Sequence, residues 1–168
     1  LFGITAGRLN IHTPFTTAHQ LCGEDLFPLM LDDPEAARRI FAKVWALYEA
    51  LFDRLTRALH ARPPRHVQLG DCSACLLSKA TYRSVVLPVN RAIAARFGEG
   101  GYHSCGASSH LLTAFAAIPG ITAIELGPGT DLETATRTLP GVALRPLIDP
   151  ILMRNGRRGE IETAIRDM

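Results

Sequence analysis

The residues best suited to chemistry form an H-x-C-G motif at residues 103–106, where an imidazole and a thiol stand two residues apart. Side chains at i and i+2 of an extended segment point to the same face, so His103 and Cys105 can approach one metal ion together. Imidazole nitrogen and thiolate sulfur are ligands that zinc prefers. The motif therefore predicts a zinc site, and the alternative is a buried histidine beside a buried cysteine.

Two further thiols, Cys72 and Cys75, form a C-x-x-C motif directly after a predicted strand at residues 66–69. Neighbouring strands of a parallel barrel are adjacent in space, so we expect these thiols near the H-x-C-G motif. A redox pair, a closed zinc site and two small core cysteines are the competing interpretations, and the adjacent Asp71 disfavours a low-pKa thiolate. Asp71 itself ends an apolar strand, which suits a ligand, a substrate contact or a helix cap.

Strands and helices alternate along the chain, and the polar residues gather just after each strand, as in parallel α/β enzymes. We predict strands at residues 1–11, 66–69, 121–126 and 142–145. A loop is predicted at 12–16, and a turn at 98–101 leads into residues 102–106. Helices are predicted at 17–31, 33–60, 80–97 (bent or restarted near Pro88), 108–117, 131–139 and 150–168 (interrupted by glycines). No G-x-G-x-x-G or P-loop motif opens a helix, so a barrel is favoured over an open nucleotide-binding sheet. A complete barrel needs eight strand–helix units and about 250 residues, so five units predict a partial barrel.

The composition excludes several other classes of protein. The 168 residues are 47% hydrophobic and 20% charged, with a net charge of +2 and four cysteines, unlike a disordered chain or a disulfide-rich secreted domain. No apolar run is long enough to span a membrane, and no signal peptide is visible. We therefore expect a cytoplasmic protein with a small-molecule substrate and with neither a nucleic-acid nor a membrane partner.

Five motifs, in this order, resemble the uroporphyrinogen decarboxylase superfamily, which includes methylcobamide:coenzyme M methyltransferases. They are Thr13–Ala18 followed by Gly23-Glu24, Asp33–Glu35 at a helix start, Ser78 with Tyr82 and Pro88, the H-x-C-G at 103–106, and Asp149-Pro150 followed by Leu152. The resemblance covers nearly the whole chain. It implies an α/β fold that is the C-terminal portion, about strands 4–8, of a (β/α)8 TIM barrel, in one domain at residues 1–168 that is truncated at both ends.

The resemblance implies one of two activities. The decarboxylases, of porphyrin biosynthesis, act on a tetrapyrrole without a cofactor, and their tyrosine and serine fall near Gln20 and Cys72, where both are replaced. The methyltransferases hold zinc with a histidine, a cysteine and a more distant cysteine, and activate a thiol for methyl transfer from a corrinoid. His103 and Cys105 match the first two ligands, the third falls beyond Met168, and Cys72 is a local substitute if the chain is complete.

The resemblance thus favours a zinc-dependent methyltransferase-like enzyme, with His103, Cys105 and Cys72 as metal ligands. Asp71 is expected to orient the site or to hold a ligand histidine through its second nitrogen. The cofactor-binding residues are then Pro14, Phe15, Thr16 and Tyr82. The resemblance to the methyltransferases also implies a corrinoid protein as a partner. We also expect the chain to need the missing N-terminal half of its barrel or a second chain, and a non-catalytic half-barrel subunit is the remaining alternative.

Overall fold

The computed structural model describes residues 2–5, 8–59 and 63–166, with the backbone alone for residues 2–5. The predicted elements that extend onto residues 1, 6–7, 60–62 and 167–168 lie, at those positions, outside the described residues. Within the described part, six strands form one sheet in the order of the chain. The strands are β1 (Phe2–Thr5), β2 (Arg8–His12), β3 (His66–Gly70), β4 (Glu99–Ser104), β5 (Ile121–Leu126) and β6 (Ala143–Pro146).

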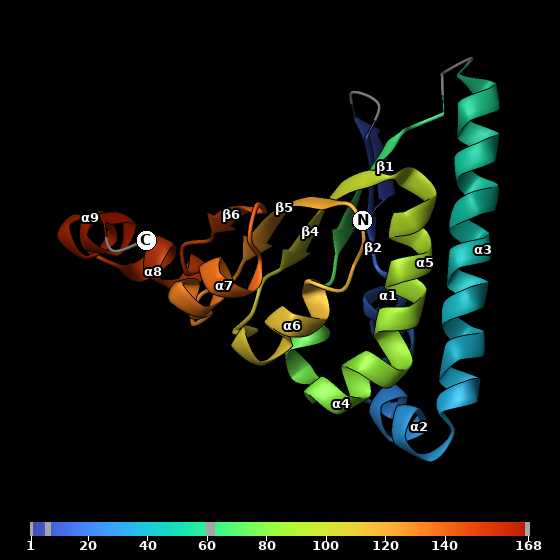
Figure 1. Ribbon diagram of the computed structural model, residues 1–168, viewed down its shortest axis with the longest axis horizontal. Coiled ribbons are helices and arrows are strands. Elements are labelled where there is room, and N and C mark those ends of the chain that lie inside the picture. The colour runs from blue at the N-terminus through green and yellow to red at the C-terminus, as the bar shows by residue number, and fades with distance from the viewer. Residues whose placement is uncertain (1, 6–7, 60–62, 167–168) are drawn as a thin grey trace.

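The five strands β2 to β6 run parallel, whereas β1 pairs antiparallel with β2. Parallel neighbours joined by helical connections confirm the predicted α/β class, and consecutive strands that lie side by side are the arrangement of a (β/α)8 barrel. Figure 1 shows α3 at one end of the molecule and α8 with α9 at the other. The bounds of the longer helices are α1 (Pro14–Cys22), α2 (Leu26–Asp32), α3 (Pro34–Ala58), α5 (Leu87–Phe97), α7 (Leu132–Thr138), α8 (Pro150–Asn155) and α9 (Arg158–Arg166).

Shorter turns of helix complete the connections between these elements. They are 3-10 turns at Gly23–Asp25, Ala74–Leu76 and Ser109–Leu111, the short helices α4 (Lys79–Thr81) and α6 (Leu112–Phe115), and a π-helix at Tyr82–Val86. The π-helix leads directly into α5, whose first turn contains Pro88. This junction is the predicted restart near Pro88, a residue that lacks the N–H for a continuous helical ladder.

The long helix α3 begins where the sequence predicts. Asp33 accepts a hydrogen bond from the backbone N–H of Ala36 at 2.9 Å, and Pro34 occupies the first turn. Its buried side chains recur every three or four residues, and α3 packs on α1 and α2. One face of α3 therefore belongs to the core, as its apolar stripe indicates.

Three local predictions are wrong. In place of the single strand predicted at residues 1–11, the described residues form two antiparallel strands, β1 and β2. The predicted loop at 12–16 is the start of α1, because Thr13 caps this helix and Pro14 suits its first turn. The predicted turn at 98–101 is a turn only at Gly98, which ends α5 with φ of 76°. Residues 99–101 extend β4, because their pairing with β3 outweighs the low strand propensity of glycine.

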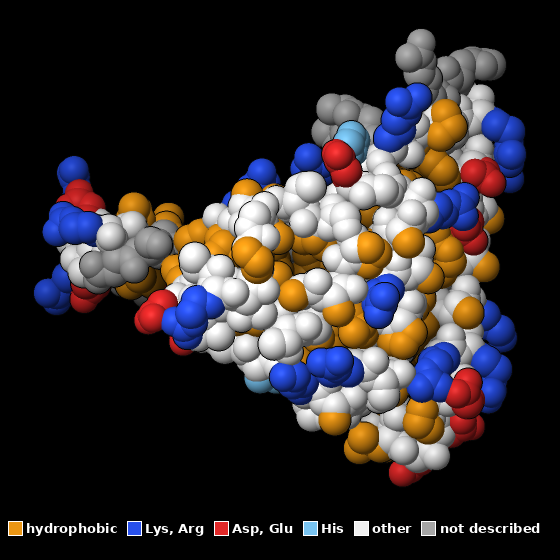
Figure 2. All heavy atoms as spheres, viewed as in Figure 1, with side chains coloured by type: hydrophobic (Ala, Val, Ile, Leu, Met, Phe, Trp, Pro, Cys, Tyr) orange, Lys and Arg blue, Asp and Glu red, His pale blue; other side chains and the backbone are white. Residues whose placement is uncertain are grey.

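The two faces of the parallel sheet differ in chemistry. On one face, alternate apolar residues such as Leu9, Val67 and Ile124 are buried under the helices. The other face carries the polar residues in register across the strands, among them Gln68 and Glu125. On the outer surface in Figure 2, basic and acidic side chains are interspersed, in keeping with the small net charge. The polar face of the sheet is therefore where chemistry is expected.

Candidate metal centre and the buried network beside it

Three metal-binding side chains meet at the carboxyl ends of β3 and β4. Cys72 follows β3, His103 lies in β4, and Cys105 follows β4. One ligand atom from each of the three lies within 4.8 Å of the other two. The register explains this, because Gly70 of β3 pairs with His103 and places the two strand ends at one level. The structure thus brings the C-x-x-C motif to the H-x-C-G motif, as expected.

The imidazole of His103 is held by Glu125 of β5. The distance from Nδ1 to the Glu125 Oε2 atom is 2.8 Å, and the two residues are direct register partners on neighbouring strands. A carboxylate can only accept, so Nδ1 is the donor, and in the neutral ring the lone pair is then on Nε2. Such a carboxylate–histidine pair orients a metal-ligating imidazole. Of the two roles expected of Asp71, the contact with the second histidine nitrogen is made by Glu125 instead.

The thiols gather around one backbone carbonyl. The Sγ atoms of Cys75 and Cys105 donate to the carbonyl oxygen of Cys72 at 3.6 and 3.8 Å. The glycine of the H-x-C-G motif is required here, since a Cβ at Gly106 would lie 2.3 Å from the Cys75 Sγ atom. Cys75 is therefore packed against the turn after β4, next to the cluster of Cys72, His103 and Cys105.

Burial raises the pKa of the Cys72 thiol to about 12, and its hydrogen bond with Cys105 acts in the same direction. Burial also raises the pKa of Cys75. Neither thiol resembles the low-pKa nucleophile of a redox C-x-x-C motif. At neutral pH Cys72 becomes a thiolate only beside a cation, so this donor set is suited to a metal ion and is compatible with zinc.

Asp71 lies directly beside this cluster but is fully buried in a separate network. Its Oδ1 atom accepts from the hydroxyls of Thr13 at 2.7 Å and Thr16 at 2.9 Å. Its Oδ2 atom accepts from the Tyr102 hydroxyl at 2.5 Å and the Asn90 amide at 3.0 Å. Burial raises the pKa of Asp71, and these four hydrogen bonds oppose that shift. The carboxylate is thus saturated with donors and holds the surrounding elements through these side-chain bonds.

That backbone connects the network to the metal cluster. The Asp71 N–H donates to the carbonyl of His103 at 2.7 Å, and the Thr13 N–H donates to the carbonyl of Gly70 at 2.8 Å. These backbone bonds therefore tie the start of α1 and the end of β4 to the segment that carries Cys72. This arrangement fits the other role expected of Asp71, which is to orient the site.

The structure separates the four residues predicted to bind a cofactor. Thr16 contacts Asp71, and the Tyr82 hydroxyl lies 2.6 Å from the Tyr102 hydroxyl in the same network. Pro14 and Phe15 are buried in the first turn of α1. None of the four lines the cavity beside the metal cluster within the described part of the chain. Their role toward a cofactor stays a prediction.

The sequence assigned no role to Glu125, Asn90 or Tyr102, although Glu125 lies among the polar residues at the predicted strand ends. Glu125 had a usable signal, because it is a carboxylate in a mostly apolar strand that neighbours the H-x-C-G strand. Asn90 and Tyr102 lack such a signal. Tyr102 precedes His103 and points to the opposite face, and Asn90 reaches Asp71 only because α5 packs on β3 and β4.

A cavity of about 270 Å³ opens on the polar face of the sheet, next to the cluster. The ends of four strands line it, and the lining includes His12, Gln68, Cys72, His103 and Glu125. Burial lowers the pKa of His12, whose Nδ1 lies 3.3 Å from the Gln20 Oε1 atom. The cavity is large enough for a small molecule to approach His103 and Cys72 from the side opposite the helices.

Parallel strands that lie side by side in chain order, with a polar site at their carboxyl ends, are typical of a (β/α)-barrel enzyme. The family model described as Uroporphyrinogen decarboxylase (URO-D) matches residues 10–168, and the chain belongs to this family. Members of the superfamily are generally enzymes, and their fold is the TIM barrel, of which the five parallel strands here are a part. A search of curated proteins gives no match. Among the described residues, no helix has the length and apolar character that crossing a membrane requires.

Proposed function

We propose that this chain belongs to a zinc-dependent, methyltransferase-like enzyme that activates a thiol for methyl transfer from a corrinoid. The observation that carries the proposal is the convergence of Cys72, His103 and Cys105, whose ligand atoms lie within 4.8 Å of one another. Two sulfurs and one imidazole nitrogen leave a fourth position of a tetrahedral zinc site open, as catalytic zinc sites require. Zinc bound there would supply Lewis-acid chemistry that lowers the pKa of a substrate thiol.

The protein residues supply orientation and access. Glu125 contacts Nδ1 of the His103 ring, which leaves Nε2 for a metal ion, and the saturated Asp71 network holds the strand ends on which Cys72 and His103 lie. The cavity lined by Cys72 and His103 gives a small molecule a path to the ligand atoms. The carboxylate of Asp71 does not take the proton of an entering thiol, since it is buried and already accepts four hydrogen bonds.

Zinc content tests the ligand set. We expect about one zinc per chain by plasma emission spectrometry, and loss of that zinc in His103→Ala, Cys72→Ser and Cys105→Ser. The matched control is Cys22→Ser, which removes an exposed thiol at the end of α1. Zinc content that stays unchanged in His103→Ala would overturn the site.

Activity separates the two branches of the family. With methylcobalamin as donor and a small thiol as acceptor, we expect demethylation of the corrinoid, seen by its absorbance, to depend on His103 and Cys105. Turnover of uroporphyrinogen by metal-free protein would instead establish a decarboxylase, for which Cys72 and Gln20 stand where that branch has a serine and a tyrosine.

We also propose that the barrel is completed by further strands, from another segment or a second chain. The sheet has β6 at one edge, paired within the described residues only with β5, and its polar face carries the site. Unpaired edge strands readily add another strand. Light scattering coupled to size exclusion tests this, and a stable, active monomer of the 168-residue chain would contradict it.

A further inference from the structure

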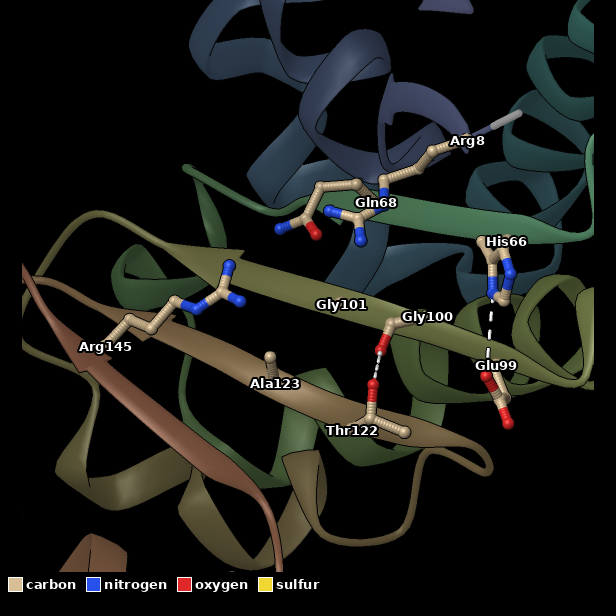
Figure 3. A pocket seen from close by; sticks show the side chains of 9 residues that line it. All are labelled: Arg8, His66, Gln68, Glu99, Gly100, Gly101, Thr122, Ala123 and Arg145. Carbon is tan, nitrogen blue, oxygen red and sulfur yellow. Dashed lines mark hydrogen bonds and ion pairs between the residues drawn. The ribbon is translucent and has the colours of Figure 1, made fainter. Parts of the chain in front are cut away.

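A second cavity, of about 150 Å³, lies on the same face of the sheet and is separate from the metal cluster. It is lined by residues of β2 to β6, and two of them are arginines, Arg8 of β2 and Arg145 of β6. Figure 3 shows the two side chains extending toward each other from opposite sides, with Gln68 between them. Two cationic groups from distant parts of the chain thus converge on one hollow.

The register explains why the hollow lies between them. Gln68 pairs with Gly101, and Gly101 pairs with Ala123, so the floor beneath the arginines carries almost no side chain. A Cβ at Gly101 would lie 2.0 Å from the Gln68 Oε1 atom. Glycine at this position therefore keeps both the floor and the Gln68 side chain in place.

The two arginines of this cavity are not neutralised by direct ion pairs within the described part of the chain. Within the described residues, no carboxylate forms an ion pair with Arg8 or Arg145. Glu99 lines the same cavity and contacts His66 at 3.6 Å, and Glu125, the register partner of Arg145, contacts His103 at 2.8 Å. Two cations that face one space repel each other unless an anion lies between them.

We propose that Arg8, Arg145 and Gln68 form a binding site for an oxyanion, the carboxylate or phosphate end of a small molecule. A guanidinium presents N–H donors in a planar fork that matches the oxygens of these groups, and charge-assisted hydrogen bonds of this kind are the strong ones. The Gln68 amide adds a neutral donor. Gln68 also lines the cavity beside His103, so a bound oxyanion lies next to the proposed metal site and not within it.

Binding of inorganic phosphate and of succinate, at low ionic strength and in separate titrations, tests the site. The Nε–H signals of the arginines in ¹⁵N NMR report saturation directly, and the stronger of the two ligands identifies phosphate or carboxylate as the preferred group. We expect Arg8→Gln and Arg145→Gln each to weaken binding about tenfold, the loss of one charge-assisted partner. Arg8→Lys should weaken it less, because a point charge is kept without the fork.

The matched control is Arg57→Gln, which removes the same charge from an exposed position on α3. Phosphate and succinate affinities that are the same in Arg8→Gln, Arg145→Gln and Arg57→Gln would overturn the site, as would the absence of saturable binding in the wild-type protein. The titration is repeated in Cys105→Ser. Unchanged affinity there shows that the oxyanion site stands whether or not the proposed metal site does.

Discussion

Asp71 and Cys72 are neighbours in the chain, yet they belong to two opposite kinds of polar site. The carboxylate of Asp71 is fully buried on the helix side, where four donors satisfy it. The thiol of Cys72 faces the cavity on the other side, beside a histidine and a second thiol. Both side chains leave the same strand end, and the change of face between consecutive residues separates them.

The difference lies in whether the polar atoms still have capacity to bind anything else. Asp71 uses both oxygens on protein donors, so its contribution is to hold α1, α5 and β4 to the end of β3. Cys72 and Cys105 have only weak contacts with a carbonyl and with each other, and the free lone pair of His103 is directed by Glu125. A saturated network supports structure, whereas an unsaturated cluster of soft donors can take a metal. Each prediction below tests one side of this comparison.

The largest effect is expected on stability when Asp71 is changed. Asp71→Ala leaves four buried donors without their acceptor, and we expect the free energy of unfolding to fall by about 4 kcal/mol. Urea denaturation followed by circular dichroism measures it. The control is Asp53→Ala, an exposed carboxylate on α3, for which the midpoint should stay unchanged. A similar small change for both variants would show that the network does not hold the strand ends.

Zinc affinity should rise steeply with pH. The pKa of Cys72 is raised to about 12, so across pH 6 to 8 this thiol must lose a full proton to bind metal. Each pH unit then strengthens binding by about tenfold from Cys72 alone, or about a hundredfold over the range. Competition with a chromogenic chelator at several pH values measures the slope. Cys72→Ser should reduce the slope by about one, and a pH-independent affinity would exclude Cys72 as a ligand.

Glu125→Gln tests how the histidine is oriented. An amide can still contact His103 but no longer supplies the negative charge that stabilises a metal-bound imidazole, so we expect zinc affinity to fall about 10- to 100-fold. Thermal stability of the metal-free protein should change little. Glu133→Gln, on the exposed face of α7, is the matched control. If both variants bind zinc equally well, the contact with Glu125 is incidental to the metal site.

The sequence predicted the parts of the molecule that depend on local pattern. The start of α3 at Asp33-Pro34, the strand that carries His103 and the approach of Cys72 to it all follow from capping, spacing and the adjacency of parallel strands. Contacts that depend on long-range packing could not be predicted from such local patterns. Asn90 is an ordinary helical residue until α5 packs on β3 and β4 and brings its amide to Asp71.

The turn predicted at residues 98–101 is a second case in which a local pattern ignores long-range contacts. Glycines at 100 and 101 indicate a turn when the chain is considered alone. In the sheet they are strand residues, and Gly101 is needed because Gln68 of the neighbouring strand occupies the space of a side chain. When a residue type is required by contact with a neighbouring strand, the sequence of its own segment does not reveal that requirement.

The smallest effect is expected where the buried network is farthest from Asp71. Tyr102 donates its hydroxyl hydrogen to Asp71, so the Tyr82 hydroxyl must donate to Tyr102. The Tyr82 hydroxyl also accepts a hydrogen bond from the Asn90 amide. Tyr82→Phe leaves every bond to Asp71 in place and should cost about 1 kcal/mol of unfolding free energy. Tyr102→Phe removes a donor from the buried carboxylate and should cost about 2–3 kcal/mol. Urea denaturation of both variants compares them, and equal costs would mean that packing of the two rings against Phe115, and not the hydrogen bond to Asp71, sets the stability of this region.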